Sequence, residues 1–157
     1  KQLSPFPKGL QVGLVNINKR KVLLNFLDHE EVIPSNQNNV YDLKIIAGDQ
    51  EYVKSMSQEI LSTIPEEFSL GQNYPNPFNP ITQMEYSLPQ SSKVVISIYN
   101  VLGQEIKTLV NKDQDYGYHS VSWDGTDRLG KSVASGVYFT QMRSGGFSQS
   151  KKMLLLK

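Results

Sequence analysis

The chain has 157 residues, of which 38% are hydrophobic and 20% are charged, and it contains no cysteine. Sixteen basic residues offset fifteen acidic ones, and a net charge of +1 argues against a sequence-independent nucleic-acid binder, which needs a basic excess. The lack of cysteine excludes disulfides, thiolate catalysis and cysteine-based zinc sites. No run of about 18 apolar residues occurs, so we expect no membrane span. No leader follows Lys1, so any signal peptide is expected to have been removed or to lie in a missing N-terminal part.

The N-terminal third predicts a small β unit. Alternating apolar residues favour strands within residues 10–17, 22–27 and 41–46, and the asparagines of residues 36–39 suit a polar turn. Three or four strands are few for independent stability. We therefore expect residues 1–56 to be a small β unit that forms the tail of a preceding domain.

A polar stretch separates this unit from the rest of the chain. Apolar residues recur at near-helical spacing between Met56 and Ile64, but the segment is short for a stable helix and stops at Pro65. We expect residues 57–67 to be a linker that contains one or two helical turns.

Dense apolar alternation after residue 80 is typical of an all-β domain. Strands are expected at residues 82–88, 93–101, 105–111, 117–124, 133–143 and 147–156. Six or seven short strands in about 90 residues favour a Greek-key sandwich. Ile98 and Trp123 are expected in its core, with Trp123 as an anchor of the core and not a binding platform.

The strand expected at residues 93–101 carries apolar residues on both faces. Val94, Ile96 and Ile98 lie on one face, and Val95, Tyr99 and Val101 on the other. A strand with two apolar faces is typical of the centre of a covered sheet, so we expect this strand to be central and covered on both sides.

Three partial matches to catalytic or metal-binding motifs fail at a required position. Residues 29–33 begin like a zinc-protease helix, but Ile33 stands where the second histidine ligand is needed. Residues 146–150 resemble a nucleophile elbow that ends in serine instead of glycine. Residues 113–124 begin like a calcium loop, but a glycine replaces one oxygen ligand and an aspartate replaces the bidentate glutamate. We expect neither catalysis nor a cofactor.

Residues 73–80 form the unusual run Asn-Tyr-Pro-Asn-Pro-Phe-Asn-Pro. Its prolines fix φ and push the preceding residues towards extended geometry, which excludes a helix. The positions expected to matter structurally are Pro75, Asn76, Pro77, Phe78 and Pro80. One interpretation is a stiff lead-in to the first strand, with Tyr74 and Phe78 packed on the end of the sandwich. The other is a ligand for an aromatic groove, and the frequency of proline-rich spacers favours the first.

Glycines and aspartates mark the turns of this domain. Gly103 supplies the positive φ that a tight hairpin needs. Asp124 and Asp127, in the loop that also contains Gly125, are expected to accept backbone N–H bonds as Asx turns. A weak calcium site is the alternative for this loop, although two carboxylates supply few ligands.

The chain ends in Lys151, Lys152, Met153, three leucines and Lys157. Apolar residues bracketed by lysines predict a final strand with charged gatekeepers. Four apolar residues are too few to anchor the chain in a membrane. Gly136 opens the preceding strand, where we interpret it as a bulge or a close-approach position.

In this order, the motifs resemble those of the type A C-terminal sorting domain of type IX secretion substrates. The similar stretches are residues 70–80, 99–104, 117, 123–125, 130, 134–139 and 151–153. The resemblance covers residues 68–157, and the flagellar hook-capping protein has a similar domain. It implies an immunoglobulin-like sandwich that carries cargo through the outer membrane of Bacteroidota-like bacteria. It also implies removal of the domain by a sortase-like peptidase and attachment of the cargo to the cell surface, or its release.

We therefore expect a non-catalytic sorting module whose partners are an outer-membrane secretion translocon and a sortase-like peptidase. The cargo is expected to pass through the periplasm to the cell surface or the medium. Residues expected to take part in partner recognition are Gly136, Lys151, Lys152, Met153 and Lys157. The alternative is a structural immunoglobulin-like spacer, or an adhesion or carbohydrate-binding domain of an extracellular protein.

Overall fold

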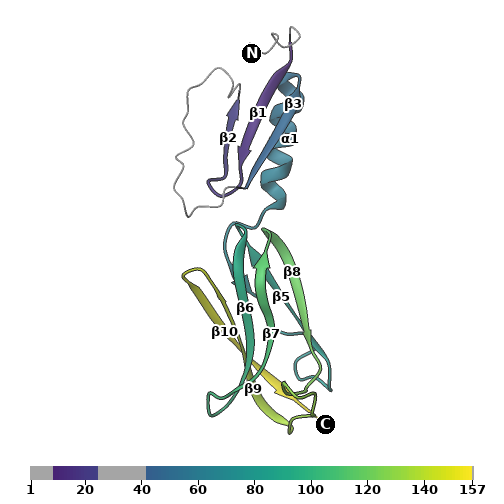
Figure 1. The fold of residues 1–157 in the computed structure, drawn as a ribbon. Helices are drawn as coiled ribbons and strands as arrows, with labels where there is room; N and C mark the ends of the chain where they lie inside the picture. Colours follow the sequence, from purple (N-terminus) through teal and green to yellow (C-terminus); the bar gives the residue numbers. More distant parts are fainter. Residues whose placement is uncertain (1–8, 25–41, 157) are drawn as a thin grey trace. The chain divides into compact units, whose positions relative to one another are not determined.

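The computed structural model describes residues 9–24 and 42–156 (Figure 1). The zinc-protease-like residues 29–33, the turn expected at residues 36–39 and Lys157 lie outside the described residues. The chain divides into two compact units, Lys1–Ile64 and Pro65–Lys157. Within the described ranges, no helix is long and apolar enough to cross a membrane.

The first unit contains an antiparallel sheet and one helix. Its strands are β1 (Gln11–Asn16), β2 (Lys21–Leu24) and β3 (Leu43–Gly48), with β1 in the middle. The helix α1 (Gln50–Thr63) packs against β1 and β3.

Local contacts define both ends of α1. At its start, the Asp49 carboxylate accepts a hydrogen bond from the Tyr52 amide at 2.8 Å, as expected of an N-cap. At its end, the Arg20 guanidinium donates to the carbonyl oxygens of Leu61 and Ile64, each at 3.0 Å. These carbonyls belong to the helix end that attracts cations, so Arg20 joins the last turn to the β1–β2 hairpin.

The helix is a correction to the linker expected at residues 57–67. Residues 57–63 are the second half of α1, and Val53 on this helix is fully buried. The expectation treated the segment as an isolated helix, whose short length makes it marginal. Packing on the sheet stabilises it instead, and the unit boundary falls between Ile64 and Pro65.

The second unit is a sandwich of two antiparallel sheets. The four-stranded sheet has the order β10-β9-β6-β7, and the three-stranded sheet has the order β4-β5-β8. The strands are β4 (Ser69–Leu70), β5 (Thr82–Leu88), β6 (Ser92–Asn100), β7 (Glu105–Gln114), β8 (Gly117–Trp123), β9 (Gly136–Ser144) and β10 (Phe147–Leu155). The chain changes sheet between β5 and β6, between β7 and β8, and between β8 and β9, as in a Greek-key sandwich. The strands expected after residue 80 are confirmed, and β4 is an addition.

The inner faces of both sheets form one hydrophobic core. Ile98 is fully buried and Trp123 is 1% exposed, which confirms both as core residues. The strand β6 is central in its sheet, but the expectation that both of its faces are covered was wrong. Val101 is 67% exposed in the turn that follows β6, and Val95 is only half-buried. The sandwich has two layers, so the outer face of β6 has no third layer to cover it.

We predict that, among the glutamates that the structure describes, a glutamate-specific endoproteinase first cuts after Glu66 or Glu67. Both residues are exposed and follow the end of α1, whereas Glu51 and Glu59 lie within the hydrogen-bonded helix. Mass spectrometry should therefore find a resistant fragment that begins at residue 67 or 68. A first cut within residues 50–63 would contradict the boundary.

Candidate functional site

Several of the residues singled out in the sequence meet at the strand β10. The backbone of Phe78 forms a parallel bridge with this strand at Leu155. The Phe78 amide donates to the Leu154 carbonyl at 3.0 Å, and the Leu156 amide donates to the Phe78 carbonyl at 2.9 Å. We call residues 72–80 the proline segment, because their backbone and side chains hold the outer edge of β10.

Two amide side chains of the proline segment extend this contact. The Leu154 amide donates to Asn76 Oδ1 at 3.0 Å, and Gln72 Nε2 donates to the Lys152 carbonyl at 2.8 Å. Asn76 Nδ2 reaches the same carbonyl at 3.4 Å. The edge of β10 is therefore closed from Lys152 to Leu156, partly by backbone and partly by side chains that imitate a strand.

The first half of β10 keeps an open edge. The backbone groups of Leu154 point away from β9, and alternate residues of a strand point the same way, so Ser148 and Ser150 face the edge too. No backbone hydrogen bond joins these two serines to another described strand on that side. Nearby, the Leu70 amide donates to Gln149 Oε1 at 2.8 Å, which fastens β4 to β10 through a side chain.

The proline segment is itself held by buried polar contacts. Asn73 is 2% exposed, and its Nδ2 donates to the Pro75 carbonyl at 3.0 Å and to Thr82 Oγ1 at 2.9 Å. The Thr82 hydroxyl donates to the same Pro75 carbonyl at 2.8 Å. Asn73 and Gln72 were not expected to have these roles. An asparagine beside three prolines is a turn signal, but it does not reveal its partner nine residues later.

Phe78 also inserts its side chain into an aromatic cluster formed with Trp123 and Tyr138. The ring centroids of Phe78 and Trp123 are 5.6 Å apart, and those of Trp123 and Tyr138 are 5.1 Å apart in an edge-to-face arrangement. The Tyr138 hydroxyl donates to the Ala134 carbonyl at 2.8 Å, and burial raises the pKa of this tyrosine. Phe78, expected to pack on the end of the sandwich, is 2% exposed and belongs to its core.

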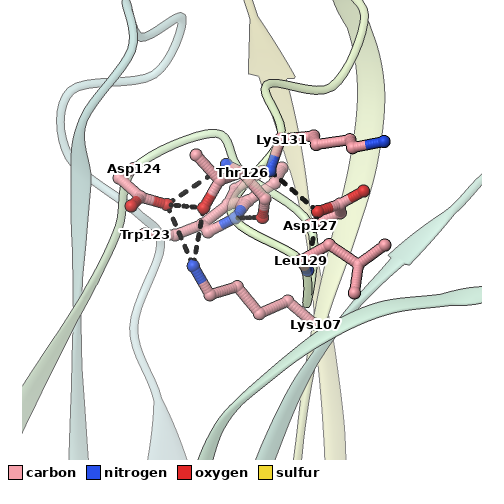
Figure 2. Close-up of polar contacts among 7 residues, drawn as sticks. All are labelled: Lys107, Trp123, Asp124, Thr126, Asp127, Leu129 and Lys131. Carbon is pink, nitrogen blue, oxygen red and sulfur yellow. Dashed lines mark hydrogen bonds and ion pairs between the residues drawn. The ribbon is translucent and has the colours of Figure 1, made fainter.

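The loop after β8 is closed by Asx turns, as expected (Figure 2). Asp124 Oδ1 accepts the Thr126 amide at 3.1 Å, and Asp127 Oδ1 accepts the amides of Leu129 and Lys131 at 2.8 and 2.9 Å. Trp123 Nε1 donates to the Thr126 carbonyl at 2.9 Å, so the loop also satisfies the polar atom of the buried indole.

Asp124 is the charged centre of this loop. Its Oδ1 accepts the Thr126 hydroxyl at 2.6 Å and the Lys107 ammonium at 3.2 Å. The Thr126 hydroxyl and then Lys107 hold the pKa of Asp124 below its ordinary value of 3.8, against the opposing effect of desolvation. An ammonium on the oxygen that a calcium ion would need disfavours the calcium alternative. Among the residues that the structure describes, no three His, Asp or Glu side chains are placed to hold a metal ion.

Several candidate recognition residues are not where the sequence suggested. Met153 is fully buried and belongs to the core. Lys151 and Lys152 are neighbours in a strand, so their side chains point to opposite faces, with Lys151 half-buried and Lys152 exposed. They do not form one positive cluster. Tyr74 was expected on the end of the sandwich but is 83% exposed.

The glycines also differ in their roles. Gly103 has φ +75°, as its turn requires, and Asn100 Oδ1 accepts the next amide of that turn, from Gln104, at 3.0 Å. Gly125 has φ +69°, and an added Cβ would lie 3.3 Å from the Pro80 carbonyl oxygen and 3.5 Å from Leu155 Cδ2. Gly136 has φ +151° but open space around it, so its backbone conformation and not a close approach favours glycine there.

Comparison with known proteins supports an immunoglobulin-like domain. Residues 81–146 match the family model described as the FlgD Ig-like domain. No curated protein is significantly similar to the chain. With the antiparallel sandwich, the family match confirms the expected fold class, an all-β immunoglobulin-like sandwich preceded by a smaller unit.

Several solved structures are similar to parts of the chain. FlgD from P. aeruginosa is 23% identical, with a TM-score of 0.39, over 47% of this chain and 57% of that one. PorZ, a surface component of the type IX secretion system of Porphyromonas gingivalis, is 17% identical, with a TM-score of 0.40, over 59% and 12%. Dimeric latent PorU from the same organism is 17% identical, with a TM-score of 0.45, over 75% and 11%. The chain thus spans at most 57% of the length of these proteins.

We predict that Asp124→Asn weakens the dependence of stability on acid pH. Because folding lowers the pKa of Asp124, its charge stabilises the fold above pH 3.8, and this contribution is lost as the pH falls through the lower folded-state value. Urea denaturation from pH 7 down to about pH 2 should therefore show a shallower loss for the variant. Asp113→Asn, an exposed change on β7, is the matched control and should follow the wild type. Equal slopes for Asp124→Asn and the wild type would contradict the assignment.

Proposed function

We propose that residues 68–157 are a non-catalytic sorting module that directs an exported cargo protein through a type IX secretion system. One observation carries the proposal: the motifs that resemble those of the sorting domain come together at the strand β10. Phe78 of the proline segment bridges Leu155, Gly125 packs beside the Leu155 side chain, and Gly136 pairs with Leu155 across the sheet. Pieces from distant parts of the sequence thus hold the end of β10 in one place.

A strand held in one place, as β10 is, suits a signal that must work on unrelated cargos. A translocon can recognise only what such cargos share, which is the surface of the folded domain that follows them. Near the chain end this surface includes the exposed Lys152, the half-buried Lys151 and the open edge at Ser148 and Ser150. An open edge allows strand addition by a partner, and the lysines contribute to steering and discourage non-specific pairing.

The partners in this proposal are an outer-membrane translocon and a sortase-like peptidase. The cargo would pass through the periplasm and end on the cell surface or in the medium. The domain supplies binding surface and no chemistry, because its polar loops are engaged in their own backbone hydrogen bonds, as at Asp124 and Asp127.

A structural immunoglobulin-like spacer or adhesion domain is the second candidate. The family match favours it, because residues 81–146 comprise the strands β5 to β9 and leave out the proline segment and the whole of β10. A spacer needs only a stable fold, whereas the sorting signal proposed here lies in β10 and the proline segment, outside the match. The two candidates therefore differ over what the chain end does.

We predict that residues 68–157 carry a fused passenger to the surface of a type IX-competent host, and that altering the open edge of β10 stops it. Ser150→Pro removes an amide that faces the open edge while leaving the hydrogen bonds to β9 intact, as proline permits on edge strands. Lys151→Gln with Lys152→Gln removes the charges. Each should lower surface passenger severalfold, measured by protease accessibility on intact cells.

The matched control for charge is Lys93→Gln with Lys112→Gln, two exposed lysines on β6 and β7. This variant should export normally, and circular dichroism should show the same fold for all variants. Normal export of both folded β10 variants would place recognition elsewhere on the domain. A wild-type fusion that stays in the periplasm of several competent hosts would reject the sorting proposal in favour of the spacer.

A further inference from the structure

The outer face of the three-stranded sheet is hollowed and polar. The hollow has a volume of about 480 Å³ and is lined by residues of β4, β5 and β8 together with Gly71. The Gly71 amide donates to the Glu85 carbonyl at 2.7 Å, and a Cβ at Gly71 would lie 3.0 Å from that oxygen. Because Gly71 has no side chain, nothing projects from this position over the surface of the sheet beside β5.

Two exposed tyrosines lie on this face: Tyr118 lines the hollow, and Tyr74 lines an adjoining one that shares Gly71, Gln83 and Glu85 with it. Tyr74 is 83% exposed and lies opposite Gln83, and Tyr118 is 75% exposed and lies opposite Ser87. Directly opposite residues of an antiparallel pair share a face, so both tyrosines project from the outer face of β5 and its neighbours. Four residues along β5 and one strand to each side separate them, a diagonal of roughly 17 Å.

The side chains between the tyrosines have unused hydrogen-bonding capacity. Gln83, Glu85 and Ser120 are exposed on this face, and none of them makes a side-chain hydrogen bond to another described residue. The strands β4, β5 and β8 contain the carboxylate of Glu85 and no lysine or arginine, and their one histidine, His119, has its Nε2 at 2.8 Å from the Asp115 carbonyl oxygen. Phosphate-bearing and other anionic polymers are disfavoured by this charge.

We propose that this face, which we call the tyrosine face, binds a neutral oligosaccharide. The flat faces of pyranose rings present C–H groups with partial positive charge, which stack on the negative face of a tyrosine ring. Sugar hydroxyls both donate and accept, so they suit the amide, carboxylate and hydroxyl groups of Gln83, Glu85 and Ser120. A diagonal of roughly 17 Å between the two rings fits a short extended oligosaccharide and exceeds a monosaccharide. The proposal does not depend on the sorting function, because it concerns the opposite sheet from β10.

The test is affinity electrophoresis of the full chain through gels that contain hydroxyethylcellulose, xyloglucan, glucomannan or soluble β-glucan. At least one of these neutral polysaccharides should retard the wild type, and heparin and alginate should not. Tyr74→Ala and Tyr118→Ala should each weaken binding about threefold to tenfold, the range expected for loss of one stacking contact. Tyr118→Phe keeps the ring and should keep most of the binding.

Leu102→Ala is the control, because Leu102 is 78% exposed in the turn between β6 and β7, on the other sheet. It should bind like the wild type, and thermal unfolding should confirm that all variants fold. The proposal is overturned if no neutral polysaccharide retards the chain or if only the anionic ones do. It is equally overturned if the folded tyrosine variants bind as well as the wild type.

Discussion

The pairing of Phe78 with the last strand is the contact on which the second unit depends. The strand β10 lies at the edge of its sheet, where unpaired amides and carbonyls would invite other chains. The backbone of Phe78 closes part of that edge at Leu154 and Leu156, while its ring enters the aromatic cluster beside Trp123. One residue therefore both covers an edge and fills the core. Only Phe78 of the proline segment bridges this strand, and residues 75–77 and 79–80 on either side of it form bends, not the extended geometry that the prolines predict.

Much of this unit could be predicted from the sequence. The period-two alternation after residue 80 located six strands, because each has one buried and one exposed face. Gly103 and the Asx turns at Asp124 and Asp127 were predictable for a similar reason, since these residues act on backbone within a few positions of themselves. Features that depend on neighbours in the sequence could thus be predicted without knowledge of the fold.

Features that depend on residues far away in the sequence could not be predicted. Asn76 Oδ1 accepts a hydrogen bond from the amide of Leu154, 78 positions later in the chain, and no local sequence pattern reveals such a contact. The exposure of Tyr74 follows from its bridge to Gln83, which places it on the outer face of the sheet. Lys151 and Lys152, both expected in partner recognition, lie on opposite faces for a simpler reason, because consecutive residues of a strand point in opposite directions. The helix α1 was underestimated because its stability comes from the sheet beneath it.

The two proposed functions use different parts of one scaffold. The chain end is fixed by β10, the proline segment and the loop after β8, and its open edge is the surface offered to a secretion partner. The tyrosine face lies on the other sheet and is the surface proposed to bind an oligosaccharide. A rigid two-layer sandwich can carry both, because binding at one sheet leaves the outer face of the other free.

Hydrogen exchange at the last strand tests the central claim most directly. The amides of Leu154 and Leu156 should be protected in the native state, although no regular strand lies on that side of β10. Asn76→Ala removes one acceptor worth about 1 kcal/mol, so exchange at Leu154 should rise roughly fivefold. The amide of Met153, which pairs with Tyr138 of β9, should exchange as slowly as before. Fast exchange at Leu154 and Leu156 in the wild type would mean an open edge and would contradict the account.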